Sequence, residues 1–533
     1  MKVTLRRRLI TVLVIALCAC GVYAAGHLGL TIRQNEETEV EEDSLFGHRE
    51  TIYLWYTDEG LTDYLNSVAV AYSEYQDEVR VVPVYTSGRE YLETVNQASL
   101  HTDEIPDLYI ISNDSLEKAY LAGLASEVQL PEGVPPLGDW FPETAVRAAT
   151  YHDKQIAYPF YFETSCFLYN LTYLEDWARA QIEAEQDAAE AEAAQQLIDD
   201  GQVPEEDAAD GAGEEGMAVS DAVNAGPNAA EGTEGEASGI SDEMVADRVR
   251  QVLPATIDDI RTFADEYDAP EQVEAVFKWD VSDIFYNYFF VGDAIDVGGV
   301  NGDQADSIHI YNENAIKCMR VYQDLNQFFS IDTKEISYDG VLQDFMDGKI
   351  VYTVATSDAL SKIETAKAEG NFAYEYGISM IPDVSEELSS ASLSVTQCVV
   401  INGYSVKKDM ANDFAVYLTE HASDMLFART GKLPVSNSGD TYEDANRAAF
   451  LQEYMYSVPM PKMVETSNFW VELEIAFAKI WDGEDANNDL KALSEKIMSQ
   501  VVGGEYTEEY IDVPEEVTEE YVDEETVEDD TGE

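Results

Sequence analysis

The sequence predicts an α/β fold, and two observations indicate it. Between residues 50 and 114, apolar strands alternate with amphipathic helices, an order typical of a mostly parallel sheet. Hydrophobic residues make up 45% and aromatic residues 11% of the 533 residues, which is enough for large cores in two or three domains. We therefore expect a globular α/β protein with additions.

The charge of the chain is strongly negative. Its formal net charge is -75, from 106 acidic and 31 basic residues. Such a charge repels nucleic acid and anionic membrane surfaces at long range, so we expect no nucleic-acid partner. Much of the excess lies in two segments that lack basic residues, and there it also promotes solubility.

The N-terminus predicts export from the cytoplasm. Lys2 and residues 6–8 form a positive segment, and an apolar run follows from Leu9 to Leu17. A positive segment followed by an apolar run is typical of an export signal, so we expect the rest of the protein on the extracytoplasmic side of the cell membrane.

Two kinds of anchor fit this N-terminus. Residues 17–20 resemble a bacterial lipobox, in which Cys20 becomes the lipidated first residue of a lipoprotein. The alternative is an uncleaved anchor over residues 9–25, a little shorter than the roughly 20 residues of a membrane span. In either case residues 1–25 are the signal and anchor, and residues 26–49 form an acidic stalk.

The first part of the folded region consists of strand and helix units. We expect strands at residues 50–58, 79–85 and 106–114, and helices at 61–75 and 89–100. Ligands of parallel sheets bind beyond the carboxyl ends of the strands, where Asp58, Glu59 and Asp114 lie. Each of these acids is equally well explained as a helix cap.

A buried strand with a charged residue at its centre follows at residues 155–170. Its aromatic and β-branched residues predict burial, yet Glu163 stands in the middle. Burial of an ionised carboxylate without partners costs several kcal/mol. Glu163 is therefore either hydrogen-bonded internally or exposed to a wet cleft, where it accepts hydrogen bonds from a ligand.

An acidic insertion interrupts the pattern. Between Arg179 and Arg248 there is no Lys, Arg or His. Residues 177–198 have the composition of an Ala/Glu helix, whereas residues 201–241 have too few apolar residues to offset the entropy of ordering. We expect residues 180–247 to be a disordered insert rather than a domain.

The folded pattern resumes near Thr256, which caps a helix. We expect strands at 276–279, 348–355, 376–382 and 398–402, and helices at 312–329, 338–347, 409–419 and 470–481. Residues 503–533 have no basic residue and predict a disordered acidic tail.

The cysteines beyond the signal predict core thiols. Cys166, Cys318 and Cys398 are widely spaced, odd in number and flanked by apolar residues. This pattern argues against disulfides or a zinc site. We expect neither a metal nor another cofactor.

Several segments carry a family resemblance by their order and spacing. They are Ile52–Asp58, Pro106–Ile111, Ala119–Val128, Ile156–Pro159 with Glu163, Leu168–Asn170, Phe345–Val354, Gly431–Pro434, Met460–Met463 and Asn468–Trp470. Together they resemble the extracellular solute-binding proteins of bacterial ABC importers, specifically the maltose/maltodextrin-binding branch. The resemblance extends from about residue 50 to 502, apart from the insert.

This resemblance implies a periplasmic-binding-protein-like fold with a ligand cleft between two α/β lobes. Lobe 1 takes residues 50–160 plus 400–447, and lobe 2 takes 164–398 plus 455–502. Hinge strands cross near Phe162, Asn402 and Tyr456. Such a protein closes around a carbohydrate and delivers it to the transmembrane subunits of a permease, so the resemblance implies a receptor rather than an enzyme, and we expect a monomer.

The resemblance also implies ligand-binding residues. Asp58, Asp114 and Glu163 match carboxylates that accept hydrogen bonds from sugar hydroxyls, and Trp470 matches the principal stacking aromatic. A pyranose offers an apolar face to such a ring and a fringe of donors to such acids. Trp470 is alternatively a core aromatic at a helix start.

The sequence departs from the family's aromatic residues. Thr356, Ser357 and Asp358 stand where the family has its second stacking aromatic, and Tyr161 and Asp283 are candidate replacements. A maltodextrin and a shorter carbohydrate therefore both stay open as ligands.

Two other classes of function remain to be weighed. The acids named above, together with Glu59, also suit a cationic ligand such as a polyamine or amino sugar. A glycoside hydrolase needs two carboxyl groups roughly 5 to 10 Å apart, and no other catalytic signature accompanies the acids. We therefore expect no enzymatic activity.

Overall fold

The computed structural model describes residues 49–514, apart from residues 89, 102–104, 200–239, 330, 437–439 and 467. The predictions for the signal, for Cys20, for most of the stalk and for residues 515–533 lie outside the described residues. Within the described part, no helix combines the length and the apolar composition that a membrane span requires.

The central feature of the described chain is a mixed sheet with the strand order β2-β1-β3-β12-β6-β10-β7. Three short strands extend it, because β11 and β13 pair with β6 and β14 pairs with β12. The strands of this sheet are β1 (Glu50–Tyr56), β2 (Val79–Tyr85), β3 (Leu108–Ser112), β6 (Tyr158–Asn170), β7 (Ala275–Phe277), β10 (Ile350–Thr356), β11 (Tyr376–Ser379), β12 (Leu393–Ile401), β13 (Leu433–Pro434) and β14 (Val458–Pro459). Two small hairpins lie outside it, β4 (Thr150–Tyr151) with β5 (Lys154–Gln155), and β8 (Asp296–Val297) with β9 (Ile308–His309).

The prediction of a mostly parallel sheet is wrong. β1 and β3 are parallel, as are β10 and β7, but β12 is antiparallel to β3 and β6 is antiparallel to both β12 and β10. The reason is that β6 and β12 are not part of the repeating strand and helix units. Neither pairs with a strand to which a single strand–helix–strand unit joins it, so the right-handed crossover that keeps strands parallel does not apply to them.

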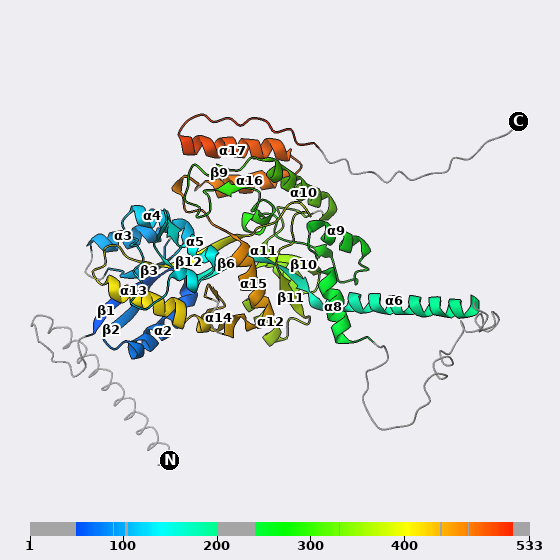
Figure 1. The fold of residues 1–533 in the computed structure, drawn as a ribbon, viewed down its shortest axis with the longest axis horizontal. Coiled ribbons are helices and arrows are strands. Elements are labelled where there is room, and N and C mark those ends of the chain that lie inside the picture. The colour runs from blue at the N-terminus through cyan, green and yellow to red at the C-terminus, as the bar shows by residue number, and fades with distance from the viewer. Residues whose placement is uncertain are drawn as a thin grey trace, which may run out of the picture. The chain divides into compact units, whose positions relative to one another are not determined.

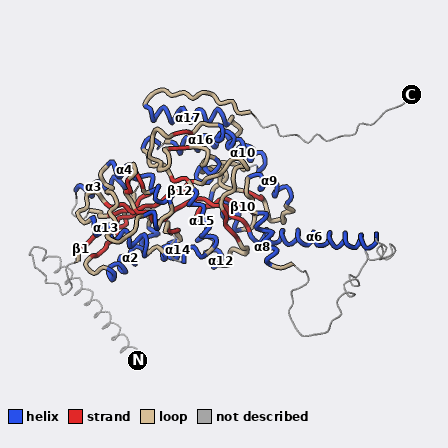
Figure 2. The backbone as a smooth tube through the Cα atoms, viewed as in Figure 1, coloured by secondary structure: helices blue, strands red, loops and turns tan. Residues whose placement is uncertain are grey.

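The helices surround this sheet (Figure 2). They are α2 (Thr62–Tyr75), α3 (Tyr91–His101), α4 (Leu116–Leu121), α5 (Glu143–Ala148), α6 (Leu171–Asp199), α8 (Asp242–Val252), α9 (Ile257–Glu266), α10 (Glu313–Phe329), α11 (Tyr338–Met346), α12 (Asp358–Glu369), α13 (Lys408–Val416), α14 (Asp424–Thr430), α15 (Ala445–Tyr456), α16 (Phe469–Trp481) and α17 (Ala486–Val502). Figure 1 shows β1 to β3 beside α2, α3, α4 and α13, while α10, α16 and α17 lie together beyond β10 and β12.

Apolar residues fill both faces of the first half of the sheet. Along β3, Leu108 and Ile110 belong to one buried cluster, whereas Tyr109 and Ile111 belong to another. Successive side chains of a strand point to opposite faces, so this alternation shows that both faces are covered. The described chain therefore has the layered, two-lobed α/β architecture that the sequence predicts.

Strand β6 connects the two halves of the sheet. Its residues up to Thr164 pair with β12, and from Ser165 onward they pair with β10. The change of partner lies between these two residues, close to the crossing expected near Phe162. Glu163 directly precedes this change.

The other two expected crossings are refined by strand pairing. β12 pairs with β14 at Leu393 and with β3 up to Ile401, so this strand changes neighbours near its start rather than near Asn402. Tyr456 ends α15, and the chain then passes through β14 to Lys462.

Burial lowers the pKa of the Lys462 amine to about 8.

The two ends of the acidic insert are helical, so disorder over the whole of residues 180–247 is wrong, whereas the Ala/Glu helix expected at 177–198 lies within α6. Helix α6 continues to Asp199, and α8 begins at Asp242 with Ser241 as its cap. Arg248 of α8 donates two hydrogen bonds to Glu185 of α6, at 2.8 and 2.7 Å. The insert thus begins and ends as a pair of helices, and residues 200–239 between them lie outside the described residues.

The first part of the predicted tail is also ordered. Residues 503–514 lie against α10 and α17, and the Arg320 guanidinium donates to the carbonyls of Val513 and Pro514 at 2.9 Å each. Val513 is buried in the same apolar cluster as α10. Two apolar residues of this segment, Ile511 and Val513, pack against the cluster. They stand among many acidic residues, so the composition of the segment gave no sign of this packing.

The three described cysteines are free and buried, as predicted. Burial raises the pKa of each thiol, to about 12 for Cys318 and Cys398. Such thiols are inert parts of the core.

Candidate functional site

The candidate site is a cavity of about 190 Å³ next to the point where β6 changes partner. It lies between the start of α12 and the turn from α14 to β13. Its lining residues are Phe162, Glu163, Ser357, Asp358, Ser361, Lys362, Thr430, Gly431 and Lys432. Two acids, two lysines and three hydroxyls thus surround one small space.

Three elements meet at this cavity for local reasons. β13 places Leu433 opposite Phe162 of β6, which brings the preceding Lys432 beside Glu163. α14 ends at Gly431, whose φ of 72° is the left-handed conformation that glycine adopts most readily at a helix end. β10 ends at Thr356, and Asp358 begins α12 two residues later.

Lys432 is the positive centre of the site. Its Nζ lies 2.7 Å from Oδ2 of Asp58 and 4.0 Å from Oε1 of Glu163. It also lies 4.9 Å from the centre of the Tyr161 ring, within the range of a cation–π contact. The ammonium group is therefore held by three residues from β6 and from the end of β1.

Asp58 has the two roles that the sequence left open. Its Oδ1 accepts a hydrogen bond from the Gly60 amide at 2.9 Å, which caps the short 3₁₀ turn Glu59–Leu61. Its Oδ2 forms the ion pair with Lys432, and Tyr161 is hydrogen-bonded to the same carboxylate. Asp58 is thus both a cap and part of the site.

Glu163 is the most open acceptor of the site. Its side chain is 49% exposed, and the Lys432 ammonium is its ion-pair partner at the longer distance of 4.0 Å. Burial raises the pKa of this carboxyl, Lys432 opposes the rise, and the negative charges of Asp358 and Asp58 add to it. Of the two alternatives for Glu163, the structure favours a carboxylate that faces a wet cavity.

Asp358 is tightly held. Its carboxylate accepts hydrogen bonds from the Tyr338 and Thr356 hydroxyls, each at 2.6 Å, and pairs with Lys362 at 2.8 Å. Burial alone would raise the pKa of Asp358, but these donors lower it below its ordinary value. Asp358 is therefore ionised over the physiological range.

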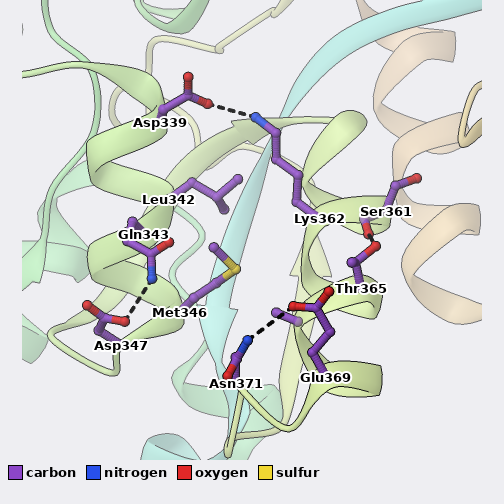
Figure 3. Close-up of a pocket in the computed structure, with 11 residues that line it drawn as sticks. Asp339, Leu342, Gln343, Met346, Asp347, Ser361, Lys362, Thr365, Glu369 and Asn371 are labelled. Atoms are coloured by element: carbon purple, nitrogen blue, oxygen red, sulfur yellow. Dashed lines mark hydrogen bonds and ion pairs between the residues drawn. The ribbon is translucent and has the colours of Figure 1, made fainter. Parts of the chain in front are cut away.

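A second and larger hollow adjoins the site between α11 and α12. Its volume is about 780 Å³, and Ser361 and Lys362 line both spaces. Figure 3 shows Leu342 and Met346 pointing into this groove between polar side chains, with Asp339 holding Lys362 at its rim. Lys362 therefore separates the small cavity from the groove.

Asp58 and Tyr161 do not line the cavity but contact Lys432 beside it, and four other predicted site residues neither line the cavity nor contact Lys432. Asp114 follows β3 and accepts a hydrogen bond from the Ser112 hydroxyl. Asp283 is exposed and caps a turn through the Phe285 amide at 2.8 Å. Glu59 is exposed on the turn that Asp58 caps.

Trp470, the fourth, is half-buried at the start of α16. Its ring centre lies 5.6 Å from that of Tyr288 and 5.0 Å from that of Phe469. It packs at the edge of the large apolar cluster of the second half of the sheet. This position agrees with the alternative of a core aromatic, although part of the ring remains accessible.

Sequence reasoning gave no role to either lysine of the cavity. Lys432 lies in the segment Gly431–Pro434, whose sequence carries only the family resemblance, and Lys362 lies in a helix without any motif. Only Lys432 had a signal in the sequence. A lysine between a helix-ending glycine and a short strand lies next to the strand with which that short strand pairs. Its partner Asp58 lies far away in the sequence, so the ion pair itself was not predictable.

Alternating donors and acceptors around a small cavity bind a hydroxyl-rich solute well, since hydroxyls both donate and accept hydrogen bonds. Within the described residues, no three His, Cys, Asp or Glu side chains group as a metal site would require. The fold and the cavity together define a two-lobed α/β binding protein.

The chain belongs to the family of bacterial extracellular solute-binding proteins. The sequence profile of this family matches residues 68–449, which is most of the described chain. Proteins of this family bind solutes outside the cytoplasm. A comparison with curated proteins finds no match.

Solved structures of sugar-binding proteins are similar in fold. A cyclo/maltodextrin-binding protein complexed with maltotetraose has a TM-score of 0.60 at 17% identity, covering 86% of this chain and 98% of that one. An extracellular solute-binding protein from Staphylococcus aureus in complex with maltose has 0.60 at 15%, covering 86% and 99%. The maltose-binding periplasmic protein of Listeria monocytogenes in complex with maltose has 0.60 at 18%, covering 86% and 100%.

Proposed function

We propose that this protein is the substrate-binding component of an ABC importer and that its ligand is a carbohydrate. The lobes close on the sugar, and the closed form delivers it to the transmembrane subunits of a permease. The observation that carries this proposal is Glu163, a carboxylate with an accessible face in a cavity lined by hydroxyls and lysines.

The character of the cavity supports a carbohydrate. Each sugar hydroxyl needs both a donor and an acceptor, and the lining offers both kinds of group within one small space. The similar solved structures that carry maltose or maltotetraose support the same class of ligand. The size of about 190 Å³ favours a single sugar ring inside the cavity itself.

We further propose that the protein is anchored at the membrane by its N-terminus, through a lipid on Cys20. The test is incorporation of labelled palmitate into the full chain in bacterial cells. Labelling that disappears in Cys20→Ala supports lipidation, and labelling that persists in this variant contradicts it.

Thermal shift and tryptophan fluorescence of the full chain test the sugar ligand. The panel consists of maltose, maltotriose, maltotetraose, cellobiose, xylobiose and their monosaccharides. A ligand that binds the folded form raises its melting temperature. We expect a shift with at least one sugar, a smaller shift in Glu163→Gln, and an unchanged shift in Glu266→Gln, whose carboxylate is exposed at the end of α9. The absence of any shift across the panel contradicts the proposal.

A cationic ligand is the second candidate, because acids outnumber lysines around the cavity once Asp58 and Asp339 are included. Spermidine and glucosamine are added to the same panel for this reason. A shift with spermidine and none with neutral sugars would establish the cationic ligand instead. Release of reducing sugar from the oligosaccharides would establish a hydrolase.

A further inference from the structure

Lys432 already occupies the position between the two acids where a cationic ligand would sit. Its ammonium group is 2.7 Å from Asp58 and 4.0 Å from Glu163, and its side chain is 21% exposed. An ammonium group has three donor hydrogens. The ion pair with Asp58 uses one of them, which leaves donors for a ligand next to Glu163.

The Asp58 carboxylate is satisfied by the protein itself. It receives the Gly60 amide at 2.9 Å, the Lys432 ammonium at 2.7 Å and a hydrogen bond with Tyr161. Tyr161 is only 3% exposed, so this arrangement rests on a fixed part of the core. A carboxylate with these three partners orients the lysine and has little capacity left for a ligand.

The distance between the Lys432 ammonium and the Glu163 carboxylate suits one bridging hydroxyl group. At 4.0 Å, the two charged atoms are too far apart for a direct hydrogen bond. One hydroxyl oxygen at about 2.8 Å from each atom bridges them, since it accepts from the ammonium and donates to the carboxylate. Charge-assisted hydrogen bonds of this kind are roughly twice as strong as neutral ones.

We propose that Lys432 contacts the ligand directly, as the donor half of a Lys432–Glu163 pair that grips one hydroxyl of a neutral sugar. Asp58 is a positioning residue, which holds Lys432 and does not itself contact the ligand. This inference rests on the proposed function and narrows it, because it selects uncharged carbohydrates over polyamines.

The charges nearby support this selection. Asp58 pairs with Lys432, and Asp358 pairs with Lys362, so Glu163 is the one carboxylate of the cavity lining without an ion pair shorter than 4.0 Å. A cationic ligand that approached Glu163 would meet the Lys432 ammonium at the same place. Like charges at such a distance repel, and part of the attraction of Glu163 is lost.

A double-mutant cycle tests the roles of the two residues. Affinities of the full chain are measured by calorimetry with maltose and with whichever sugar of the panel gives the largest thermal shift. We expect Lys432→Met to weaken binding 10- to 100-fold and Asp58→Asn to weaken it about 10-fold. In the Lys432→Met background, Asp58→Asn should change the affinity less than 2-fold, because its effect passes through the lysine.

Two further variants serve as controls for the Lys432→Met result. Lys349→Met removes a lysine that pairs with Asp344 and Glu274 instead, and it should leave affinity unchanged. Lys432→Gln keeps a hydrogen-bond donor without the charge and should lose less affinity than Lys432→Met. It also provides a second measurement if the methionine variant folds poorly. Unfolding midpoints in urea check that each variant is folded.

The outcomes separate this inference from the proposed function. If sugars bind and Lys432→Met leaves affinity unchanged, the role of Lys432 is refuted while the sugar receptor stands. If Asp58→Asn costs the same factor in both backgrounds, Asp58 contacts the ligand itself and its positioning role is refuted. If spermidine binds and no sugar does, both proposals fail together.

Discussion

Replacement of Gly431 by alanine probes the contact between α12 and the turn that carries Lys432. Gly431 ends α14 with a φ of 72°, and an added Cβ would lie 3.1 Å from Ser361 Cβ and closer still to its hydroxyl. Gly370 provides a matched control. It ends α12 with nearly the same φ of 74°, and an added Cβ there meets nothing within 4 Å.

The two glycines separate a backbone cost from a packing cost. A left-handed conformation costs an alanine about 1 to 2 kcal/mol, and both variants lose this amount. Gly431→Ala also forces Ser361 to move, and overpacking of this kind costs about 1 to 3 kcal/mol more. We therefore expect a total loss of about 2 to 5 kcal/mol for Gly431→Ala and about 1 to 2 kcal/mol for Gly370→Ala.

Urea unfolding measures these losses, and calorimetry with a bound sugar measures the effect on the site. Gly431→Ala should lower the affinity for the sugar because it displaces Lys432 and one wall of the cavity, whereas Gly370→Ala should leave this affinity unchanged. Adding Ser361→Ala to Gly431→Ala should recover part of the stability, since it removes the closest atom. Equal losses for the two glycine variants would refute the contact between Ser361 and Gly431.

Four further predictions concern other parts of the molecule. Burial raises the pKa of Glu453 from 4.5 to about 7, so the folded chain keeps a proton that the unfolded chain releases. The stability that this proton contributes is complete below pH 4.5 and is lost as the pH rises through 7. Glu453→Gln should therefore stabilise the protein by about 3 kcal/mol at pH 8 and hardly at pH 4.5. A difference in the free energy of unfolding between variant and original chain that stays constant over this pH range, measured by urea unfolding, would contradict the prediction. Burial also raises the pKa of Glu163, so sugar affinity should fall on acidification at a higher pH than for an ordinary glutamate, and calorimetry should show this fall disappear in Glu163→Gln. Trp470 packs at the edge of an apolar cluster outside the cavity lining, so Trp470→Ala should leave sugar affinity unchanged, and a loss of about 1 to 3 kcal/mol of affinity would instead establish a stacking role. Arg320→Ala should release residues 503–514, seen as faster cleavage there by a protease and a loss of about 1 kcal/mol in stability, whereas unchanged cleavage would show that the arginine does not hold the segment.

The sequence was a good guide where periodicity is strong and local. The strand predicted at residues 79–85 has those same bounds in β2, and the helix predicted at 312–329 is α10 to within one residue. Both elements bury one regular face, so their pattern follows directly from the contacts they make. The direction of β6 and β12 was not predictable in this way, because it depends on pairing with strands that lie far away in the sequence.

The site was predictable in its acids and not in its cations. Asp58, Tyr161, Glu163 and Asp358 do gather at or beside one cavity. A carboxylate inside an apolar strand is conspicuous in a sequence, because burial of such a group demands an explanation. Lys432 is inconspicuous by comparison, since a lysine near a turn is ordinarily solvated, and only the pairing of β13 with β6 brings it to Asp58.

Under the proposed function, the position of Glu163 would link ligand binding to closure of the lobes. β6 leaves β12 after Thr164 and joins β10 at Ser165, which pairs with Thr356. Thr356 donates to Asp358 at 2.6 Å, so both acids of the cavity lie within two residues of this change of partner. A ligand favours closure only to the extent that it binds the closed form more tightly than the open one. In the proposed function, a sugar that bridges Glu163 and Lys432 on one side and contacts α12 on the other would have this property if it made both sets of contacts only in the closed form.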